Sequence, residues 1–381
     1  MHSDGKKRRS FVALLFADGD LRRYCFVGGL VSFVKPKYSK KQINRAGEIL
    51  ISDSSSVSER NFADEVLTNF RAAHGYPINT FQATLRAKLK GIDEKAIVAQ
   101  RLKRTPSIIL KLKRFDGMKL ARMQDIGGLR AVVSSIARVR KLEKSYRESR
   151  FLHELVSSKD YLAEPKADGY RGIHLIYKYT NTNAPEYNGL SLELQIRTRL
   201  QHAWATAVET MGTFLGQALK SGQGEDQWRE FFSIAGAALA DLEKTTPVQG
   251  FENCSTRQIH KQLFESERRL RVLEKLSGFA IAADKITTER GQGGYHLITL
   301  DSTKRTVTIR PFPVARLEEA NIAYAAIEAR TKAGEPIEAV LVSAGPVELL
   351  RKAYPNYFLD TQVLVRQLQR LIDGHRQVTK R

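Results

Sequence analysis

Between about residues 96 and 217, strand-like runs alternate along the chain with helix-like segments. Leu129 to Ser134 and Ile173 to Thr180 are rich in β-branched or alternating residues, and the run SLELQI alternates strictly between polar and apolar positions. The basic segment from Ile136 to Arg150 and the segment from about Thr198 have the character of helices. Strands that alternate with helices in this way predict an α/β fold.

Helical segments precede this region, and a second mixed unit follows it. Helical spacing predicts a small helical subdomain from about residue 40 to 95, with a break at Pro77 and a new helix near Thr80. A mainly helical stretch is predicted over Glu230 to Leu276. It is followed by a predicted hairpin over Tyr295 to Leu300 and Arg305 to Ile309, a helix over Val314 to Lys332, a strand over Ile337 to Val342 and a helix over Val347 to Tyr354. The order of these C-terminal segments is αββαβα. We therefore expect an irregular extension over 1–30, a helical segment over 31–95, an α/β domain over 96–250 and a C-terminal domain over 251–381.

The charge balance of the chain indicates its partners. Lysine and arginine number 62 against 41 acidic residues, which gives a net charge of +21 over 381 residues. Such a charge attracts polyanions, of which nucleic acids and nucleotides are the first candidates, although a merely solvated basic surface is the alternative. Only Cys25 and Cys254 are present, so a disulfide framework and a zinc site are excluded. No segment approaches the roughly 20 apolar residues of a membrane span, and we expect a soluble cytoplasmic protein with no membrane partner.

Two acidic residues stand next to predicted strands. In SLELQIRT the leucines and the isoleucine point to one face, whereas Glu193, Gln195 and Arg197 point to the other. Asp125 precedes the strand at Leu129, and the glycines of MQDIGGLR allow the backbone to approach a ligand closely. Two such acids can share a magnesium ion, which binds one or two carboxylates together with phosphate oxygens. The alternative is that each acid is a surface residue or a cap.

A row of polar and basic residues lies upstream in QRLKRTPSIILKLKR. The threonine and proline of this segment predict a helix start. Lys103, Ser107 and Lys111 fall on one face if the helix extends back far enough. Fixed cations and the backbone donors of a helix start can hold phosphate groups, although basic helix faces are often only solvated.

The loop EPKADGYRGIH combines two cations, a turn, an aromatic ring and an imidazole. Lys166 and Arg171 flank a turn at Asp168 and Gly169, which leaves Tyr170 exposed on a loop where its ring can stack on a nucleobase. His174 points to the face opposite its apolar neighbours; a satisfied core histidine is the alternative.

In order and spacing, these motifs resemble the synthetase domain of the RelA/SpoT alarmone synthetases. The resemblance covers about residues 95 to 245 and rests on RLK with Ser107 and Lys111, DIGGLR, YLAEPKADGYRGIH, ELQIRT, and HAWA followed by Glu209. It implies a nucleotidyltransferase-like mixed sheet flanked by helices, and transfer of the β,γ-pyrophosphate of ATP to a ribose 3′-hydroxyl, usually of a guanosine nucleotide.

The resemblance also implies roles for individual residues. Asp125 would hold magnesium, and Glu193 would share that metal or orient the attacking hydroxyl. The remaining implied site residues are Arg101, Lys103, Ser107, Lys111 and Arg114 around the ATP phosphates with Arg130 close by, Lys166, Tyr170, Arg171 and His174 for the acceptor nucleotide, and Gln195 and Arg197 as supports.

The C-terminal part resembles the CapRel-type fused toxin and antitoxin proteins of antiphage defence. That resemblance spans about residues 31 to 375, including VKPKYSKKQINRAGEIL and YPNYFLDT. It implies a bacterial or prophage-encoded toxin that modifies the terminal adenosine at the acceptor end of tRNA. It also implies a C-terminal domain that closes the synthetase until a phage protein, such as the major capsid protein, binds. Tyr354 and Tyr357 would then insert into the adenine site, unless both pack within their own domain.

Three functions stay open on the sequence alone. The first is a toxin that modifies tRNA, with KPKYSKK, the helix from Arg138 to Arg150 and the row at Arg268, Arg269 and Arg271 as candidate contacts to the RNA backbone. The second is a small alarmone synthetase that makes guanosine or adenosine tetra- and pentaphosphates. The third is a non-catalytic nucleic-acid-binding or sensor protein, against which the presence of both Asp125 and Glu193 argues.

Overall fold

The computed structural model describes residues 33–379, except 104, 151, 218, 220–223, 289–293, 302, 305, 334, 336 and 344–356. Val34–Arg381 form one compact unit. The expected extension over 1–30 and the expected helix over Val347 to Tyr354 therefore lie outside the described residues.

The N-terminal segment is helical, as the sequence predicts. Its helices are α1 (Lys40–Ile51), α2 (Val57–Ala73) and α3 (Gly75–Lys90). The first two begin at capping boxes: the serine side chain accepts from the backbone N–H of the third helical residue, and the serine backbone N–H donates to the side chain of that residue. The predicted start of the third helix near Thr80 is wrong: α3 begins at Gly75, and Pro77 lies within its first turn, where a missing backbone N–H breaks no helical hydrogen bond.

A five-stranded mixed sheet follows, with the order β1-β2-β5-β4-β3. Its strands are β1 (Ile97–Leu102), β2 (Gly127–Val133), β3 (Glu154–Asp160), β4 (Ile173–Lys178) and β5 (Ser191–Thr198). Only the central pair, β2 with β5, is parallel; the other neighbours are antiparallel. The α/β fold class with a mixed sheet flanked by helices is confirmed.

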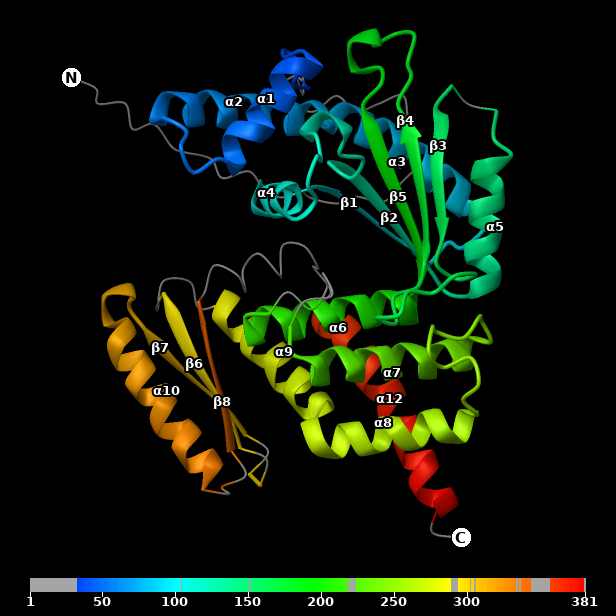
Figure 1. The fold of residues 1–381 in the computed structure, drawn as a ribbon. Coiled ribbons are helices and arrows are strands. Elements are labelled where there is room, and N and C mark those ends of the chain that lie inside the picture. The colour runs from blue at the N-terminus through cyan, green and yellow to red at the C-terminus, as the bar shows by residue number, and fades with distance from the viewer. Residues whose placement is uncertain are drawn as a thin grey trace, which may run out of the picture. The chain divides into compact units, whose positions relative to one another are not determined.

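Helices cover one face of this sheet. α3 contacts β1 and β2, and α5 (Ile136–Arg147) contacts β5, so these two helices lie on the same side (Figure 1). Shorter elements line the connections and are α4 (Thr105–Arg114), the 3-10 turns η1 (Leu120–Arg122) and η2 (Pro185–Tyr187). The threonine and proline start of α4 is confirmed. The opposite face of the sheet is left for other side chains.

After β5 the described part of the chain is mainly helical as far as Thr288. Thr198 ends the strand and caps the next helix, because its side chain accepts from the backbone N–H of Gln201. The helices are α6 (Arg199–Leu215), α7 (Asp226–Glu243), α8 (Thr256–Leu270) and α9 (Val272–Thr288). One hydrophobic core joins side chains from all four helices and from elements beyond them, so it runs past residue 250 without interruption.

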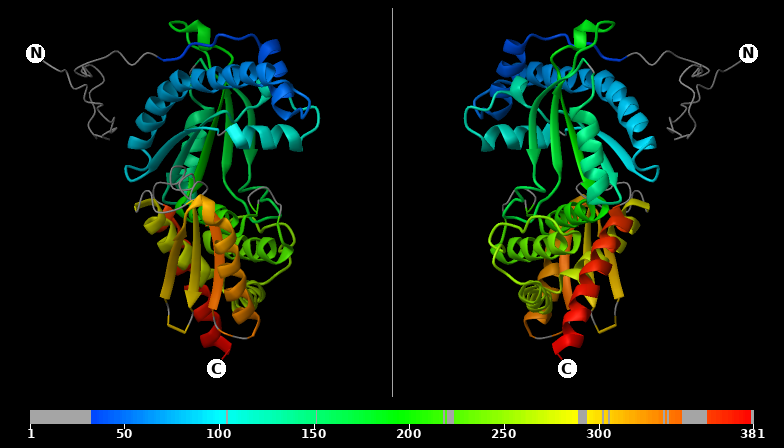
Figure 2. Two further views of the ribbon diagram at one scale, coloured as in Figure 1. Left: turned by 90° about the vertical axis from the view of Figure 1, so that its left-hand side faces the viewer. Right: turned by 90° about the vertical axis from the view of Figure 1, so that its right-hand side faces the viewer.

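The C-terminal elements form a small sheet with helices. Strands β6 (Tyr295–Asp301), β7 (Thr306–Phe312) and β8 (Ile337–Ser343) are antiparallel in the order β7-β6-β8, which confirms the predicted hairpin and strand. The short turn η4 (Val314–Arg316) leads into α10 (Leu317–Lys332), which covers one face of the sheet while α9 contacts the other (Figures 1 and 2).

The last helix, α12 (Tyr357–Thr379), was not predicted from the sequence. It packs against α6, α8 and α9, and its Leu364, Leu368 and Ile372 are buried. Over the described residues, the structure has no helix with the length and apolar character that crossing a membrane requires.

Candidate active site

The uncovered face of the five-stranded sheet carries the predicted residues in adjoining rows. Gly128 on β2 pairs with Arg101 on β1 and with Glu193 on β5. Paired residues on neighbouring strands point to the same face, so Arg101 and Glu193 stand on either side of a glycine that has no side chain. A methyl group built at Gly128 would lie 3.8 Å or more from its neighbours, which leaves an open floor between the cation and the acid.

The next row on the same face brings three more predicted residues together. Arg130 on β2 pairs with Gln195 on β5, and Gln195 pairs in turn with His174 on β4. These residues come from strands that are far apart along the chain, and the strand register places them side by side. Arg197 follows two residues after Gln195 and therefore points to the same face.

Asp125 lies immediately before β2 and is held by two lysines. Lys103 Nζ lies 2.6 Å from one carboxylate oxygen, and Lys111 Nζ from α4 lies 3.0 Å from the other. Burial acts to raise the pKa of Asp125, but the two ammonium groups outweigh it and hold that pKa below its ordinary value. Asp125 is therefore ionised at neutral pH.

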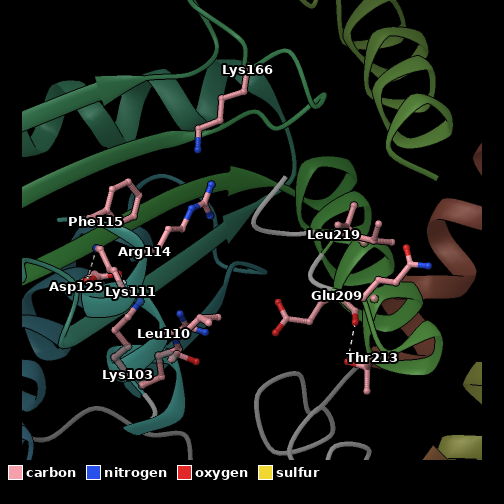
Figure 3. A pocket seen from close by; sticks show the side chains of 15 residues that line it. Lys103, Leu110, Lys111, Arg114, Phe115, Asp125, Lys166, Glu209, Thr213 and Leu219 are labelled. Atoms are coloured by element: carbon pink, nitrogen blue, oxygen red, sulfur yellow. Dashed lines mark hydrogen bonds and ion pairs between the residues drawn. The ribbon is translucent and has the colours of Figure 1, made fainter. Parts of the chain in front are cut away.

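A basic cavity of about 520 Å³ opens beside Asp125. Its cationic side chains come from β1, the connection from β1 to α4, α4 itself and the loop after β3, and are Arg101, Lys103, Lys111, Arg114 and Lys166. Ser107 also lines this cavity, and α6 contributes Glu209 and Thr213 from the opposite wall. In Figure 3, Lys166 points into the cavity from above and Glu209 reaches in from α6. This excess of fixed positive charge fits a polyphosphate.

A narrow cleft adjoins the basic cavity. Asp125 and Glu193 both line it, together with Arg101, Arg130 and Gln195. The sequence placed one acid before a strand and the other within a different strand, and the structure brings both to the same cleft. Both acids thus line one cleft, although each carboxylate contacts other side chains.

Glu193 belongs to a closed ring of hydrogen bonds. His174 Nδ1 lies 2.9 Å from Glu193 Oε1, and Gln195 Nε2 donates to Oε2 at 2.7 Å. On the far side, Arg197 Nη2 donates to Gln195 Oε1 at 2.8 Å and to the Tyr170 hydroxyl at 2.6 Å. The Tyr170 hydroxyl closes the ring by a hydrogen bond of 2.5 Å to His174 Nε2.

The ring is complete with a neutral imidazole. If the Tyr170 hydroxyl donates to His174 Nε2, then His174 Nδ1 carries the proton that it donates to Glu193. Burial lowers the pKa of His174, although Glu193 acts to raise it, and this agrees with a neutral ring. Burial acts to raise the pKa of Glu193, but the hydrogen bonds from His174 and Gln195 outweigh it and lower that pKa to about 2. Glu193 is an ionised acceptor whose orientation is fixed.

A second cavity, of about 160 Å³, lies on the other side of this ring. We call it the aromatic cavity. It is lined by Lys166, Asp168, Tyr170, His174, Gln195, Arg197, Trp204, Ala205, Val208, Leu219, Arg229 and Phe232. Lys166 lines both this cavity and the basic cavity, so a ligand could extend from one to the other. The aromatic walls suit a planar ring such as a nucleobase.

Tyr170 is not the exposed ring that the sequence predicted. It is half-buried; the Arg197 guanidinium lies 4.9 Å from its ring centre and Lys166 Nζ lies 5.2 Å away. The ring is not exposed because its hydroxyl forms hydrogen bonds with His174 and Arg197 and because the neighbouring Trp204 contacts the ring edge to face. Burial raises the pKa of Tyr170, so it stays protonated.

Arg171 has a different place from the one expected for an acceptor-binding residue. Its guanidinium is 2% exposed, lines neither cavity, and donates to Glu243 at 2.7 Å and to Thr245 at 3.1 Å. The residue after Tyr170 points away from the cavity because its neighbour points into it. The structure thus replaces a ligand contact by a buried ion pair.

The two carboxylates of the cleft are ligands of the kind that magnesium prefers. Asp125 and Glu193 supply carboxylate oxygens to the same cleft, and magnesium takes one or two carboxylates together with phosphate oxygens. Among the residues that the structure describes, no group of three or more His, Cys, Asp or Glu side chains is arranged to hold a metal. Phosphate oxygens would therefore have to complete the coordination.

Several cavity residues were missed from the sequence. Phe115 and Leu110 are exposed at the basic cavity, and Trp204, Arg229 and Phe232 line the aromatic cavity. Leu110 lies on α4 and Phe115 follows it directly, and the sequence does not distinguish an apolar side chain that lines a cavity from one that packs in a core. Arg229 and Phe232 lie on α7, whose packing against the sheet domain no local pattern reveals.

Tyr354 and Tyr357 were expected to insert into the adenine site. Tyr354 lies outside the described residues, and Tyr357 begins α12 with a side chain that is likewise undescribed. Three residues later, Asp360 Oδ2 lies 3.1 Å from His202 Nε2 on α6. His202 is the first residue of the HAWA motif, so α12 contacts the helix that lines both cavities.

Part of the chain is similar to known proteins in sequence. Residues 100–212 match the model of the region found in RelA / SpoT proteins. The GTP pyrophosphokinase YjbM of Bacillus subtilis (strain 168) is 33% identical over 134 residues, which cover 32% of this chain and 63% of that protein. The GTP pyrophosphokinase YwaC of the same organism is 33% identical over 114 residues, or 28% of this chain and 52% of that protein. The chain thus matches less than two thirds of either relative.

A search of solved structures finds small alarmone synthetase 1 from Bacillus subtilis bound to its product pppGpp. It is 26% identical, with a TM-score of 0.37, and the match covers 44% of this chain and 90% of that one. The matched sequence region contains both acids of the cleft, the loop with Tyr170 and the HAWA motif. Residues 100–212 are therefore similar to the region found in RelA / SpoT proteins.

Proposed function

We propose that this chain is an ATP-dependent pyrophosphokinase. In the proposed reaction a ribose 3′-oxygen forms a bond to the β-phosphorus of ATP. The bond from that phosphorus to the oxygen shared with the α-phosphate breaks, AMP leaves with the electron pair, and the hydroxyl proton is released. The supporting observation is that Asp125 and Glu193 share one cleft beside a basic cavity and an aromatic cavity.

The basic cavity would hold the triphosphate. Phosphoryl transfer asks a protein mainly to align the reactants and to stabilise charge on the phosphate oxygens. Lys103 and Lys111 already lie at Asp125, and Arg114 and Lys166 line the same cavity. We expect these cations to contact phosphate oxygens when ATP is present. Magnesium, held by Asp125 and Glu193, would neutralise further charge on the transferred group.

Glu193 would orient the attacking hydroxyl. A carboxylate with a pKa of about 2 is a weak general base, but it is a strong and well-placed hydrogen-bond acceptor. The ring of His174, Gln195, Arg197 and Tyr170 would fix its direction. The aromatic cavity would hold the acceptor base next to Tyr170.

For the acceptor, we propose the terminal adenosine of tRNA. The net charge of +21 supports this choice, because contacts to phosphates dominate nucleic-acid affinity. Among the suggested RNA contacts, Arg140 and Arg147 of α5 form ion pairs with Glu143, and Arg269 and Arg271 form ion pairs with Glu230 and Glu274. RNA phosphates would compete with these acids in both places. Free guanosine nucleotides are the second candidate, because the two relatives are named GTP pyrophosphokinases.

We also propose that the C-terminal elements inhibit the synthetase until a phage protein binds them. α12 packs along α6, Asp360 pairs with His202, and the rings of Phe279 on α9 and Phe214 on α6 stack at 4.4 Å. A shift of α9 or α12 would therefore also displace α6, which lines both cavities. A phage protein could open the site only if it bound the open state better than the closed state.

One experiment tests both the reaction and the acceptor. The full chain is incubated with magnesium, ATP labelled on the γ-phosphate, and either tRNA, GTP, GDP or no acceptor. We expect AMP to form in step with label on tRNA. Label on GTP or GDP would favour an alarmone synthetase. If no acceptor carries label when the chain is alone or when Asp360→Ala weakens the contact with α6, the pyrophosphokinase proposal fails.

A further inference from the structure

The loop that carries Lys166 and Tyr170 rests directly on α7. We call residues 166–171 the acceptor loop. Ser233 Oγ on α7 donates a hydrogen bond of 2.6 Å to the carbonyl oxygen of Ala167 in this loop. Within the loop, Gly169 N donates to Lys166 O at 2.9 Å, so the turn presents its carbonyl groups to the helix in a fixed arrangement.

Two glycines allow the loop and the helix to touch backbone to backbone. A methyl group built at Gly236 on α7 would lie 2.5 Å from the Cα of Gly169 and 2.7 Å from its carbonyl oxygen. Gly169 has a φ of +91°, and a methyl group there would lie 2.8 Å from the carbonyl oxygen of Phe232. Neither position tolerates a side chain without movement of the loop or the helix, because the atoms met are backbone atoms.

The same helix also fixes the wall of the aromatic cavity. Trp204 Nε1 donates to the carbonyl oxygen of Phe232 at 2.9 Å, and the two rings meet edge to face. Phe232 and Trp204 both line the aromatic cavity. A change in the seating of the loop on α7 would therefore alter two sides of that cavity.

The C-terminal end of α7 holds the other end of the loop. Glu243 accepts from Arg171 at 2.7 Å and from Gln201 Nε2 at 3.0 Å, and its second oxygen accepts from the hydroxyl of Thr198. Arg171 follows Tyr170, whereas Thr198 follows directly on Arg197. The buried carboxylate of Glu243 thus connects the segment before β4 with the end of β5. β4 carries His174 and β5 carries Arg197, and these are the two hydrogen-bond partners of the Tyr170 hydroxyl.

We infer that α7 is the platform that positions the acceptor loop, with Gly236 and Glu243 as positioning residues for acceptor binding. The kinetic part of this inference rests on the proposed function, but the placement of the loop does not. α7 begins at Asp226, beyond the matched region that ends at residue 212, so the platform is a part of the site that the family region does not include.

The test uses the full chain and two measurements. The first is amide hydrogen exchange of the segment from 161 to 174, which reports loop seating without any substrate. The second is the KM for the acceptor compared with the KM for ATP. The variants are Gly236→Ala, Ser233→Ala and Glu243→Gln. The matched controls are Gly374→Ala, where a helical glycine has open space, and Glu230→Gln on the exposed side of α7.

We expect Gly236→Ala to raise exchange in the loop segment about tenfold or more while exchange in the small C-terminal sheet is unchanged. The acceptor KM should rise about tenfold or more, with the ATP KM within about twofold of the wild-type value, because the loss of alignment affects one substrate. Ser233→Ala and Glu243→Gln should give smaller shifts of the same kind, and both controls should behave like the wild type.

Each alternative outcome has a clear reading. Unchanged loop exchange in a folded Gly236→Ala protein would overturn the inference. Exchange that rises equally across the whole chain, or equal increases of both KM values, would also overturn it, because the helix would then have only a general structural role. If Gly236→Ala does not fold, the other two variants decide by the same measurements. If the wild type transfers nothing, the proposed function fails and loop exchange alone tests the platform.

Discussion

The ammonium group of Lys103 lies 2.6 Å from the carboxylate of Asp125, and Lys111 lies 3.0 Å from the other oxygen of the same acid. The Lys103 side chain is 11% exposed and that of Asp125 is 20% exposed. This cluster keeps a half-buried acid ionised at the mouth of a basic cavity. The oxygens that the lysines now hold are the ones that a metal bound to ATP would take, so we expect the ammonium groups to turn to phosphate oxygens when ATP binds.

Replacing Asp125 tests this cluster. Asp125→Asn removes the charge and keeps the shape of the side chain. We expect it to reduce the rate of AMP formation about 100-fold or more, since transition-state charge stabilisation by one group is typically of that size. The measurement is AMP released from ATP with the acceptor at saturation. The control is Asp116→Asn, which changes an exposed acid next to Gly117.

A rate for Asp125→Asn within about threefold of the wild type would contradict the role of Asp125, provided that a chemical unfolding curve shows the variant to be folded. The same curve should show some loss of stability, because Lys103 would remain buried without its ionic partner.

The hydrogen-bond ring predicts how stability depends on pH. The pKa of Glu193 is about 2 in the folded chain against an ordinary value of 4.5. Because of this lowered pKa, Glu193 takes up a proton at a higher pH in the unfolded chain than in the folded chain. The contribution of Glu193 to folding stability is therefore complete above about pH 4.5 and is lost as the pH falls toward about 2. We therefore expect the wild type to lose roughly 1 kcal/mol or more of unfolding free energy between pH 5 and 3 in excess of the loss in Glu193→Gln.

His174 contributes in the same direction at higher pH. Its pKa is lowered in the folded chain, so the unfolded chain binds the proton more readily below about pH 6.5 and stability falls as the pH drops through that range. Comparison with His174→Gln isolates this part. Parallel pH profiles for the wild type and for both variants would show that the ring does not control either titration.

Two substitutions of Tyr170 distinguish the role of its ring in stacking from the role of its hydroxyl in hydrogen bonding. Tyr170→Phe keeps the ring but leaves His174 and Arg197 without the hydroxyl, and we expect a modest rise in the acceptor KM. Tyr170→Ala removes the wall of the aromatic cavity and should abolish measurable acceptor binding. Because the ring is half-buried, the alanine variant should also lose about 1 to 3 kcal/mol of stability. Acceptor titrations and urea unfolding of both variants check this, and equal acceptor KM values in both would exclude a stacking role.

Glu267, a half-buried acid on α8, gives an independent test. Burial raises the pKa of Glu267 to about 7, although the backbone N–H groups of Leu273 and Val272 oppose the shift. A raised pKa contributes stability that is present below about 4.5 and is lost as the pH rises through about 7. Glu267→Gln, which mimics the neutral acid, should be more stable than the wild type by about 1 kcal/mol at pH 8.5 and equal to it at pH 5. A variant less stable at both pH values would show that the carboxylate is favourable there.

The contact between α12 and α6 gives the prediction about inhibition. Asp360→Ala removes the partner of His202, and we expect faster AMP formation and slower growth of cells that express the protein without phage. Gln369→Ala is a control on an exposed part of the same helix. An Asp360→Ala protein that is folded and has wild-type activity would contradict inhibition through this contact.

Much of the site follows from sequence patterns because its side chains are local to strands and short motifs. The alternation in SLELQIRT places Glu193, Gln195 and Arg197 on one face, and the structure agrees. Thr105 and Pro106 mark the start of α4 for the same local reason. The loop motif locates Lys166 and Tyr170 at the cavities, as expected.

The parts that were not predicted depend on contacts between distant segments. Strands β1 and β3 were missed because the first is charged at its end and the second, ELVSSKD, has few apolar residues. The burial of Arg171 depends on Glu243, 72 residues later. α12 contains polar residues throughout and is fixed by packing against α6, which no local pattern reveals.

The most direct test of the central claim is the identity of the products that the full chain makes from ATP. We expect AMP in a one-to-one ratio with a 3′-diphosphate on tRNA or a guanosine nucleotide, and loss of both products in Asp125→Asn and in Glu193→Gln. Formation of ADP and phosphate as the only products, or AMP formation that persists in both variants, would contradict the claim that the two acids form one site for diphosphate transfer.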